Sequence, residues 1–178
     1  MTRIENASVE EWKKLYDANF FSALALVSPD HLGPGTGFGL TFYKTKEAIP
    51  RLRASKGRIV LVSSGAATGA YTAWGAYGSS KAALNSLAAH VAVEEPEITS
   101  VAISPGRVDT DMQKELREKG TEMLKKEYDT FKADFEEGRL VKPEQSGGVI
   151  AKLAVSAGPE LSGKYFKWDA PALAEYRK

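Results

Sequence analysis

Arg58-Ile-Val-Leu-Val-Ser-Ser64 is typical of a buried β-strand that ends in a hydroxyl group, and Tyr77-Gly-Ser-Ser-Lys81 begins thirteen residues after Ser64. In open α/β sheets, ligands bind outside the carboxyl ends of the strands, where the Ser64 hydroxyl would lie. On a helix, Tyr77 and Lys81 share one face and lie about 6 Å apart along the axis. A nearby ammonium group stabilises a phenolate and lowers the pKa of tyrosine from about 10 towards the range of a general acid or base.

Each of these residues also has an ordinary structural interpretation. A tyrosine four residues before a lysine is common on helices, and a serine after a strand is more often a cap or a turn residue. Only the combination of Ser64, Tyr77 and Lys81 predicts proton-transfer chemistry.

The flanking residues extend the pattern. Gly57 to Ala67 surrounds the serine, Ala76 to Leu84 surrounds the tyrosine and lysine, and Ile103-Ser-Pro-Gly-Arg-Val-Asp-Thr110 follows. Together these segments resemble the short-chain dehydrogenase/reductase family, whose signature is a serine followed by Tyr-x-x-x-Lys and then by a Pro-Gly-x-x-x-Thr segment. The resemblance implies an α/β fold, a partial Rossmann-like doubly wound parallel sheet. It is strongest to fungal benzil reductases and sepiapterin reductase-like members.

The resemblance also implies roles for four catalytic residues. Tyr77 would exchange a proton with the substrate oxygen, and Ser64 would hydrogen-bond and orient that oxygen. Lys81 would lower the pKa of Tyr77 and hold the ribose hydroxyls of the cofactor. Asn19 matches the asparagine that supports a proton-relay water in the family, although a polar residue in mid-helix is usually just solvated.

The same resemblance implies a nicotinamide cofactor, NADP with NAD as a possibility. The cofactor-binding residues would be Tyr77 and Lys81 together with Pro105, Gly106, Val108 and Thr110. The substrate pocket would include Ser64, Tyr71, Trp74 and Met112, although packing in the core or in a dimer explains the last three equally well.

One part of the family pattern is missing. Family members open with a strand and a glycine-rich turn that holds the pyrophosphate and helps to select NAD or NADP. This sequence has no such segment before Ser8, so we interpret it as an N-terminally truncated, C-terminal portion of the domain. The run Gly33-Pro-Gly-Thr-Gly-Phe-Gly39 is a poor substitute, because it neither follows a strand nor opens a helix.

That run lies in a suspected foreign insert at residues 27–44. A capping box at Ser8 and Glu11 begins a helix that we expect to extend to Leu26 and to continue at Thr45 once the insert is removed. The codons that can encode residues 27–44 are compatible with fungal intron signals, which suggests a translated intron. Transcript sequences decide whether residues 27–44 occur in the protein.

The remaining pattern alternates strands with helices, as a parallel sheet requires. We expect strands at 58–63, 99–104 and near 163–168, and helices at 75–93, within 110–137 and at 143–156. The chain has 178 residues, 24 basic against 23 acidic side chains, no cysteine and two histidines. These counts argue against nucleic-acid binding, thiol chemistry and a metal site, and the absence of a long apolar run argues for a cytoplasmic chain.

Two functions remain open on the sequence. The first is an NAD(P)H-dependent oxidoreductase of the carbonyl reductase type, acting on a small carbonyl or alcohol substrate and forming a homo-oligomer. The second is a non-catalytic truncated remnant that at most pairs through its helices as a dimerisation module.

Overall fold

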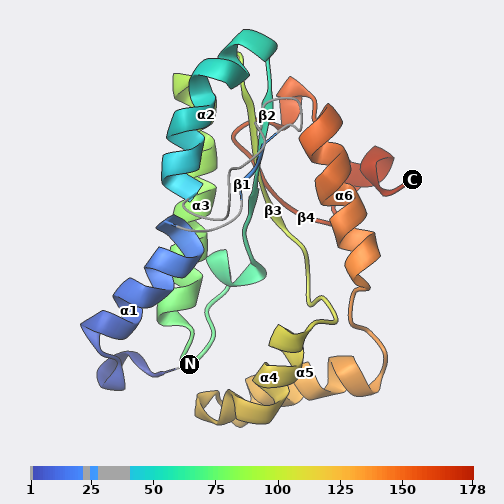
Figure 1. The fold of residues 1–178 in the computed structure, drawn as a ribbon. Helices are drawn as coiled ribbons and strands as arrows, with labels where there is room; N and C mark the ends of the chain where they lie inside the picture. The colour runs from blue at the N-terminus through green and yellow to red at the C-terminus, as the bar shows by residue number, and fades with distance from the viewer. Residues whose placement is uncertain (1, 22–24, 28–40) are drawn as a thin grey trace.

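Four strands form one sheet in the computed structural model, which describes residues 2–21, 25–27 and 41–178 (Figure 1). The strand order is β1–β2–β3–β4, where β1 is Ala25–Val27, β2 is Arg58–Val62, β3 is Thr99–Ser104 and β4 is Tyr165–Lys167. Strands β2, β3 and β4 are parallel, with Arg58 opposite Thr99 and Ala102 opposite Tyr165. The predicted parallel sheet is confirmed, and its central strands β2 and β3 are buried as expected of a sheet covered on both faces.

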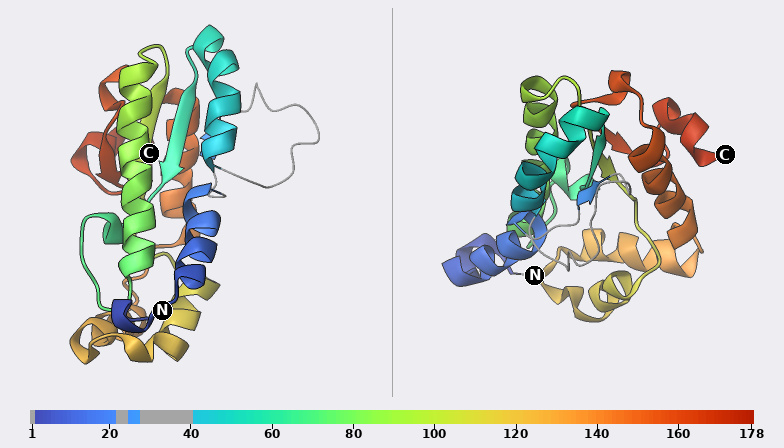
Figure 2. Two further views of the ribbon diagram at one scale, coloured as in Figure 1. Left: turned by 90° about the vertical axis from the view of Figure 1, so that its left-hand side faces the viewer. Right: turned by 45° about the horizontal axis from the view of Figure 1, so that its top comes forward.

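Helices cover both faces of this sheet. On one face lie α2 (Thr41–Ser55) and α3 (Gly75–Glu94), side by side in Figures 1 and 2, and on the other lies α6 (Pro143–Ser156). The α3 side holds a buried cluster with Leu52, Leu84 and Ile98 at its centre, and the α6 side holds one around Val149 and Leu153. Helices α3 and α6 agree with the predicted ranges to within a residue.

The N-terminal segment differs from the predicted helix 8–26. Helix α1 covers Val9–Tyr16 and begins with the expected capping box, in which Ser8 and Glu11 exchange hydrogen bonds of 3.0 and 3.1 Å. A π-helical turn, Asp17–Phe21, follows it, and Ala25–Val27 then pairs antiparallel with β2. The expected continuous helix to Leu26 is therefore wrong, because β1 supplies hydrogen-bond partners for the edge of β2.

Most of the suspected insert at 27–44 lies outside the described residues, and so does the glycine-rich run. Helix α2 begins at Thr41 rather than at 45, and Val27 ends β1. The insert stays a prediction.

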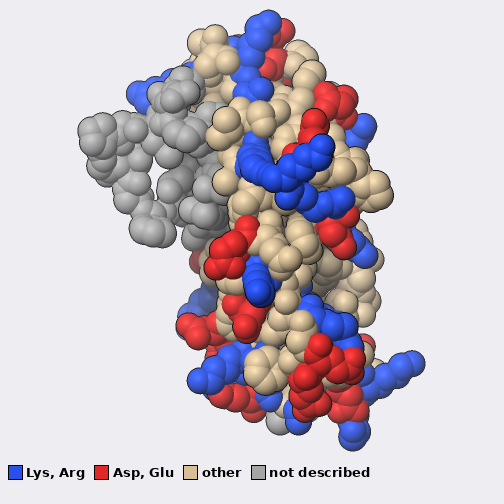
Figure 3. Space-filling model, turned by 90° about the vertical axis from the view of Figure 1, so that its right-hand side faces the viewer, with Lys and Arg blue, Asp and Glu red and all other residues tan. Residues whose placement is uncertain are grey.

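Helices α4 (Asp111–Lys119) and α5 (Lys125–Glu136) form a separate layer beyond the carboxyl ends of β2 and β3 (Figure 1). They occupy the region predicted to be charged and helical. On the face seen in Figure 3, basic and acidic side chains are interspersed. Among the described residues, no helix has the length and apolarity needed to cross a membrane.

Candidate active site

Ser64 lies just beyond the carboxyl end of β2. The ladder with β3 continues one residue past the strand, since the Ser63 amide donates to the Ile103 carbonyl at 2.8 Å. Ser64 has an extended backbone, and its hydroxyl accepts a 3.2 Å hydrogen bond from the Ala66 amide. Its carbonyl oxygen accepts a 3.3 Å hydrogen bond from the Tyr165 hydroxyl of β4. The Ala66 amide thus holds the Ser64 side chain, and Tyr165 holds its backbone.

Helix α3 approaches this strand end closely because Gly78 has no side chain. A Cβ atom on Gly78 would lie 2.8 Å from the Ala66 carbonyl oxygen, which is backbone and cannot move aside cheaply. This approach brings Tyr77, on the first turn of α3, close enough to Ser64 for the serine side chain to lower the pKa of the phenol. The close approach of helix and strand end therefore explains why the residue after Tyr77 is a glycine.

Lys81 lies one helical turn further along α3. Its ammonium nitrogen is 5.8 Å from the centre of the Tyr77 ring and donates to the Val62 carbonyl at 2.9 Å. Burial lowers the pKa of Lys81 to about 8. Burial also raises the pKa of Tyr77, and the hydrogen bond from Ser64 only partly opposes that shift.

The direction of the Tyr77 shift differs from the expectation that Lys81 lowers this pKa. The loss of water around the phenol dominates, and the Lys81 ammonium is directed at the end of β2. In this arrangement Tyr77 is held protonated, which is the state required of a proton donor.

Asn19 lies in the π-helical turn, and its amide donates a 3.3 Å hydrogen bond to the Ser80 hydroxyl. That hydroxyl in turn donates to the Tyr77 carbonyl at 2.8 Å. Asn19 is thus tied to the segment of α3 between Tyr77 and Lys81. Single π-helical turns occur frequently at functional sites, because they redirect one side chain within a helix.

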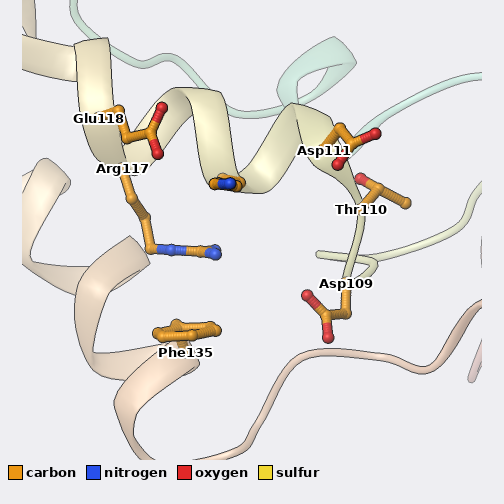
Figure 4. Close-up of a pocket in the computed structure, with 7 residues that line it drawn as sticks. Asp109, Thr110, Asp111, Arg117, Glu118 and Phe135 are labelled. Carbon is orange, nitrogen blue, oxygen red and sulfur yellow. The ribbon is translucent and has the colours of Figure 1, made fainter.

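The turn after β3 carries the predicted cofactor residues. Gly106 has a φ of +83°, and a Cβ atom there would lie 3.0 Å from the Trp168 ring nitrogen, so the position requires glycine. Val108 forms an isolated parallel bridge with Val141. Thr110 is exposed at the start of α4 and lines an open pocket of about 550 Å³ (Figure 4), whose other lining residues are Asp109, Asp111, Lys114, Arg117, Glu118 and Phe135.

Only part of this site suits a nicotinamide dinucleotide. The Lys81 ammonium and the Tyr77 hydroxyl are donors that fit ribose hydroxyls. The Thr110 pocket has three acidic and two basic lining residues, so it offers no net positive charge for a pyrophosphate. The chain's residues fit the nicotinamide riboside end of the cofactor better than its phosphates.

Aromatic side chains form the wall beside Tyr77. The Trp74 ring meets the Tyr77 ring edge-on at a centroid distance of 5.3 Å. Tyr71 and Phe131 lie 5.3 and 5.6 Å from Trp74. Met112 lies outside this cluster and is 66% exposed, so of the predicted pocket residues Ser64, Tyr71 and Trp74 come together at Tyr77 and Met112 does not join them.

Sequence reasoning missed three residues that shape this site: Phe131, Arg107 and Tyr165. Phe131 has a weak signal, because it and Phe135 lie one turn apart on a charged helix and must face something apolar. Arg107 stands inside a quoted motif, but nothing local indicates its distant partners. Tyr165 reaches Ser64 across 101 residues of sequence.

The comparisons with known proteins agree with the fold and with the family resemblance of the sequence. The short chain dehydrogenase family matches residues 38–121. An uncharacterised oxidoreductase of Schizosaccharomyces pombe is 39% identical over 96% of this chain and 62% of its own length. A benzil reductase ((S)-benzoin forming) of Saccharomyces cerevisiae is 36% identical over 90% of this chain and 57% of its own length.

A crystal structure of a short chain dehydrogenase/reductase from Saccharomyces cerevisiae superimposes with a TM-score of 0.86 at 34% identity, covering 99% of this chain and 64% of that one. The chain belongs to the short-chain dehydrogenase/reductase family, and it spans less than two thirds of the length of these relatives.

Proposed function

We propose that the protein is an NAD(P)H-dependent carbonyl reductase, which transfers a hydride between nicotinamide and a carbonyl/alcohol pair. The observation that carries the proposal is the convergence of Ser64, Tyr77 and Lys81 at the carboxyl end of β2, where the Lys81 ammonium lies 5.8 Å from the Tyr77 ring and donates to the Val62 carbonyl. Membership of an oxidoreductase family supports the class of reaction.

The chain's own residues suffice for the proton half of this reaction. The Ser64 hydroxyl donates a hydrogen bond to the substrate carbonyl oxygen and orients it, and the Tyr77 phenol transfers its proton to that oxygen as the carbonyl carbon is reduced. Lys81 holds the ribose hydroxyls, and Asn19 stabilises the helix segment between Tyr77 and Lys81. A reduced nicotinamide, when bound, supplies the hydride.

For the cofactor we favour NADP over NAD, since benzil reductases are among the relatives that the sequence resembles. The favoured substrate is a small ketone or diketone with an aromatic group, because Tyr71 and Trp74 offer it ring faces beside the phenol. The exposed sides of α1 and α3 are the expected homo-oligomer contacts, and a cytoplasmic location stays a prediction of the sequence.

The test uses two proteins, the 178-residue chain and a chimera in which the N-terminal part of the Saccharomyces cerevisiae benzil reductase precedes it. NADPH and NADH binding are titrated by cofactor fluorescence, and reduction of benzil is followed by loss of NADPH absorbance. We expect turnover by the chimera and none by the 178-residue chain alone, because the Thr110 pocket offers no net positive charge for a pyrophosphate. An inactive chimera that still binds NADPH would support the non-catalytic remnant instead.

Within the chimera, Tyr77→Phe should lower turnover by about 10² to 10⁴-fold, because the proton donor is lost. The NADPH affinity of this variant should remain nearly unchanged. Lys81→Ala should lower both turnover and NADPH affinity. Tyr16→Phe, which removes a phenol from α1 outside the site, is the matched control. Normal benzil reduction by Tyr77→Phe contradicts the catalytic assignment.

A further inference from the structure

Arg107 and Phe131 form a stacked pair at the inner side of α5. The Arg107 guanidinium carbon lies 3.8 Å from the centre of the Phe131 ring, which is only 2% exposed. Arg107 also donates to the Asp134 carboxylate at 2.5 Å and to the Thr130 carbonyl at 3.1 Å. A planar guanidinium can stack on a ring and donate hydrogen bonds at the same time, so the Arg107 side chain contacts three residues of α5.

The contacts continue from Phe131 to the catalytic phenol. The Phe131 ring lies 5.6 Å from Trp74 with an interplanar angle of 37°, and Trp74 meets Tyr77 edge-on at 5.3 Å. Tyr71 closes the group at 6.1 Å from Phe131. A side chain from the turn after β3 is thereby connected to Tyr77 through two aromatic rings.

The base of Arg107 is fixed by backbone pairing. Its carbonyl accepts a 2.9 Å hydrogen bond from the Val141 amide, and the Asp109 amide donates to the Val141 carbonyl at 2.9 Å. Gly106 directly precedes Arg107, and there is no room at this position for a side chain. The backbone of Arg107 is therefore firmly held in place. Helix α5 is anchored less, because Phe131 is the single buried residue among its described side chains.

We propose that Arg107 is a positioning residue, which holds α5 through Phe131 against Trp74 and so fixes the aromatic wall beside the Tyr77 phenol. The consequence for reduction rests on the proposed function, but the mechanical link does not. Arg107 is the residue directly after the Pro105-Gly106 turn, so the same segment of backbone carries the predicted cofactor turn and the side chain that holds the wall. Ligand contacts at that turn and the position of the wall are then coupled.

Arg139 provides a matched control. It also donates to Asp134, at 2.9 Å, so Asp134 keeps an ion pair when Arg107 is removed. Arg139 is 49% exposed, and it also pairs with Glu137 rather than with an aromatic ring. Arg107→Met removes the stacked cation and its hydrogen bonds, whereas Arg139→Met removes ion pairs to Asp134 and Glu137 but no ring contact.

The experiment follows Trp74 by ¹⁹F NMR in the 178-residue chain labelled with 5-fluorotryptophan, with the resonance assigned by Trp74→Phe. Hydrogen exchange of residues 125–136 is measured alongside. In Arg107→Met we expect the Trp74 resonance to shift and broaden and exchange in α5 to rise roughly tenfold. Phe131→Leu should move the same resonance, and Arg139→Met should leave it in place.

Arg107→Lys keeps the charge and its attraction to Asp134 but loses the planar stack, so it should restore the exchange rate more than the Trp74 resonance. It also serves if Arg107→Met does not fold. An unmoved Trp74 resonance in folded Arg107→Met or Arg107→Lys overturns the inference. Since these readouts need no turnover, a failed reductase assay leaves them intact, and in an active chimera the Tyr77→Phe result stands independently.

Discussion

Two regions of the molecule are held together differently. The first is the strand-end corner, which is built from β2, α3 and β3. The second is the aromatic wall, taken together with α4 and α5, which includes Tyr71 and Trp74. The corner rests on a buried strand ladder and on fully buried side chains such as Leu84 and Ile103. The wall has a small core of three buried residues, Leu116, Met123 and Phe131, completed by aromatic rings from elsewhere. The corner therefore shares the main buried core of the sheet, whereas the wall depends on side chains supplied by other segments.

The same substitution in each region should separate them. Leu84 is fully buried in the α3 cluster, so Leu84→Ala should cost towards the upper end of the roughly 2–5 kcal/mol typical of buried Leu→Ala changes. Leu116→Ala should lie at the lower end, because the small cluster around it can relax. Urea unfolding followed by circular dichroism gives both values. An equal or larger loss for Leu116→Ala would mean that the wall belongs to the main cooperative core.

The turn that joins the two regions should be sensitive to one methyl group. Gly106→Ala should cost about 1–3 kcal/mol, since φ is +83° and the new Cβ would press on Trp168 and Val141. Gly138→Ala is the control, because Gly138 also has a positive φ, +66°, but no atom within 4 Å of a new Cβ. It should cost roughly 1 kcal/mol from backbone strain alone. Equal costs in thermal unfolding would show that packing at the turn is unimportant.

These two regions also differ in what the sequence could predict. Ser64, Tyr77 and Lys81 were found because strand ends and helical spacing are local properties, and the structure brings all three together. The Arg107–Phe131 stack joins residues 24 positions apart through a tertiary contact, which no spacing encodes. The helix expected to reach Leu26 failed for a similar reason, since pairing with a distant strand outweighs helical propensity at 25–27.

The direction of the Tyr77 pKa shift is another property that the sequence could not predict. The spacing of Tyr77 and Lys81 was read correctly as a shared helix face, but the pKa depends on burial by segments such as the one that carries Trp74. Burial is a property of the folded molecule, so the sequence could place the two groups but not the balance between desolvation and charge.

The last prediction uses Lys81 to probe that burial within the corner. Its pKa is lowered by burial from 10.5 to about 8, so between these values the unfolded chain binds more protons at this site than the folded one. Stability therefore rises with pH across this window, and the cost of burying the charged lysine is fully present below pH 8. The raised pKa of Tyr77 matters only above about pH 10, where the phenol begins to ionise in the unfolded chain and stability falls.

Melting temperatures from pH 7 to pH 9.5 should therefore increase for the 178-residue chain relative to Lys81→Met, in which this titration is absent. We expect a smaller change than for either substitution above, because an ammonium that already donates to the Val62 carbonyl is partly compensated. Lys56→Met, which removes a lysine that is 78% exposed, is the control and should track the parent chain. A pH dependence that Lys81→Met does not alter would mean that water reaches Lys81 freely, and that the corner is less closed around Tyr77 and Lys81 than the structure indicates.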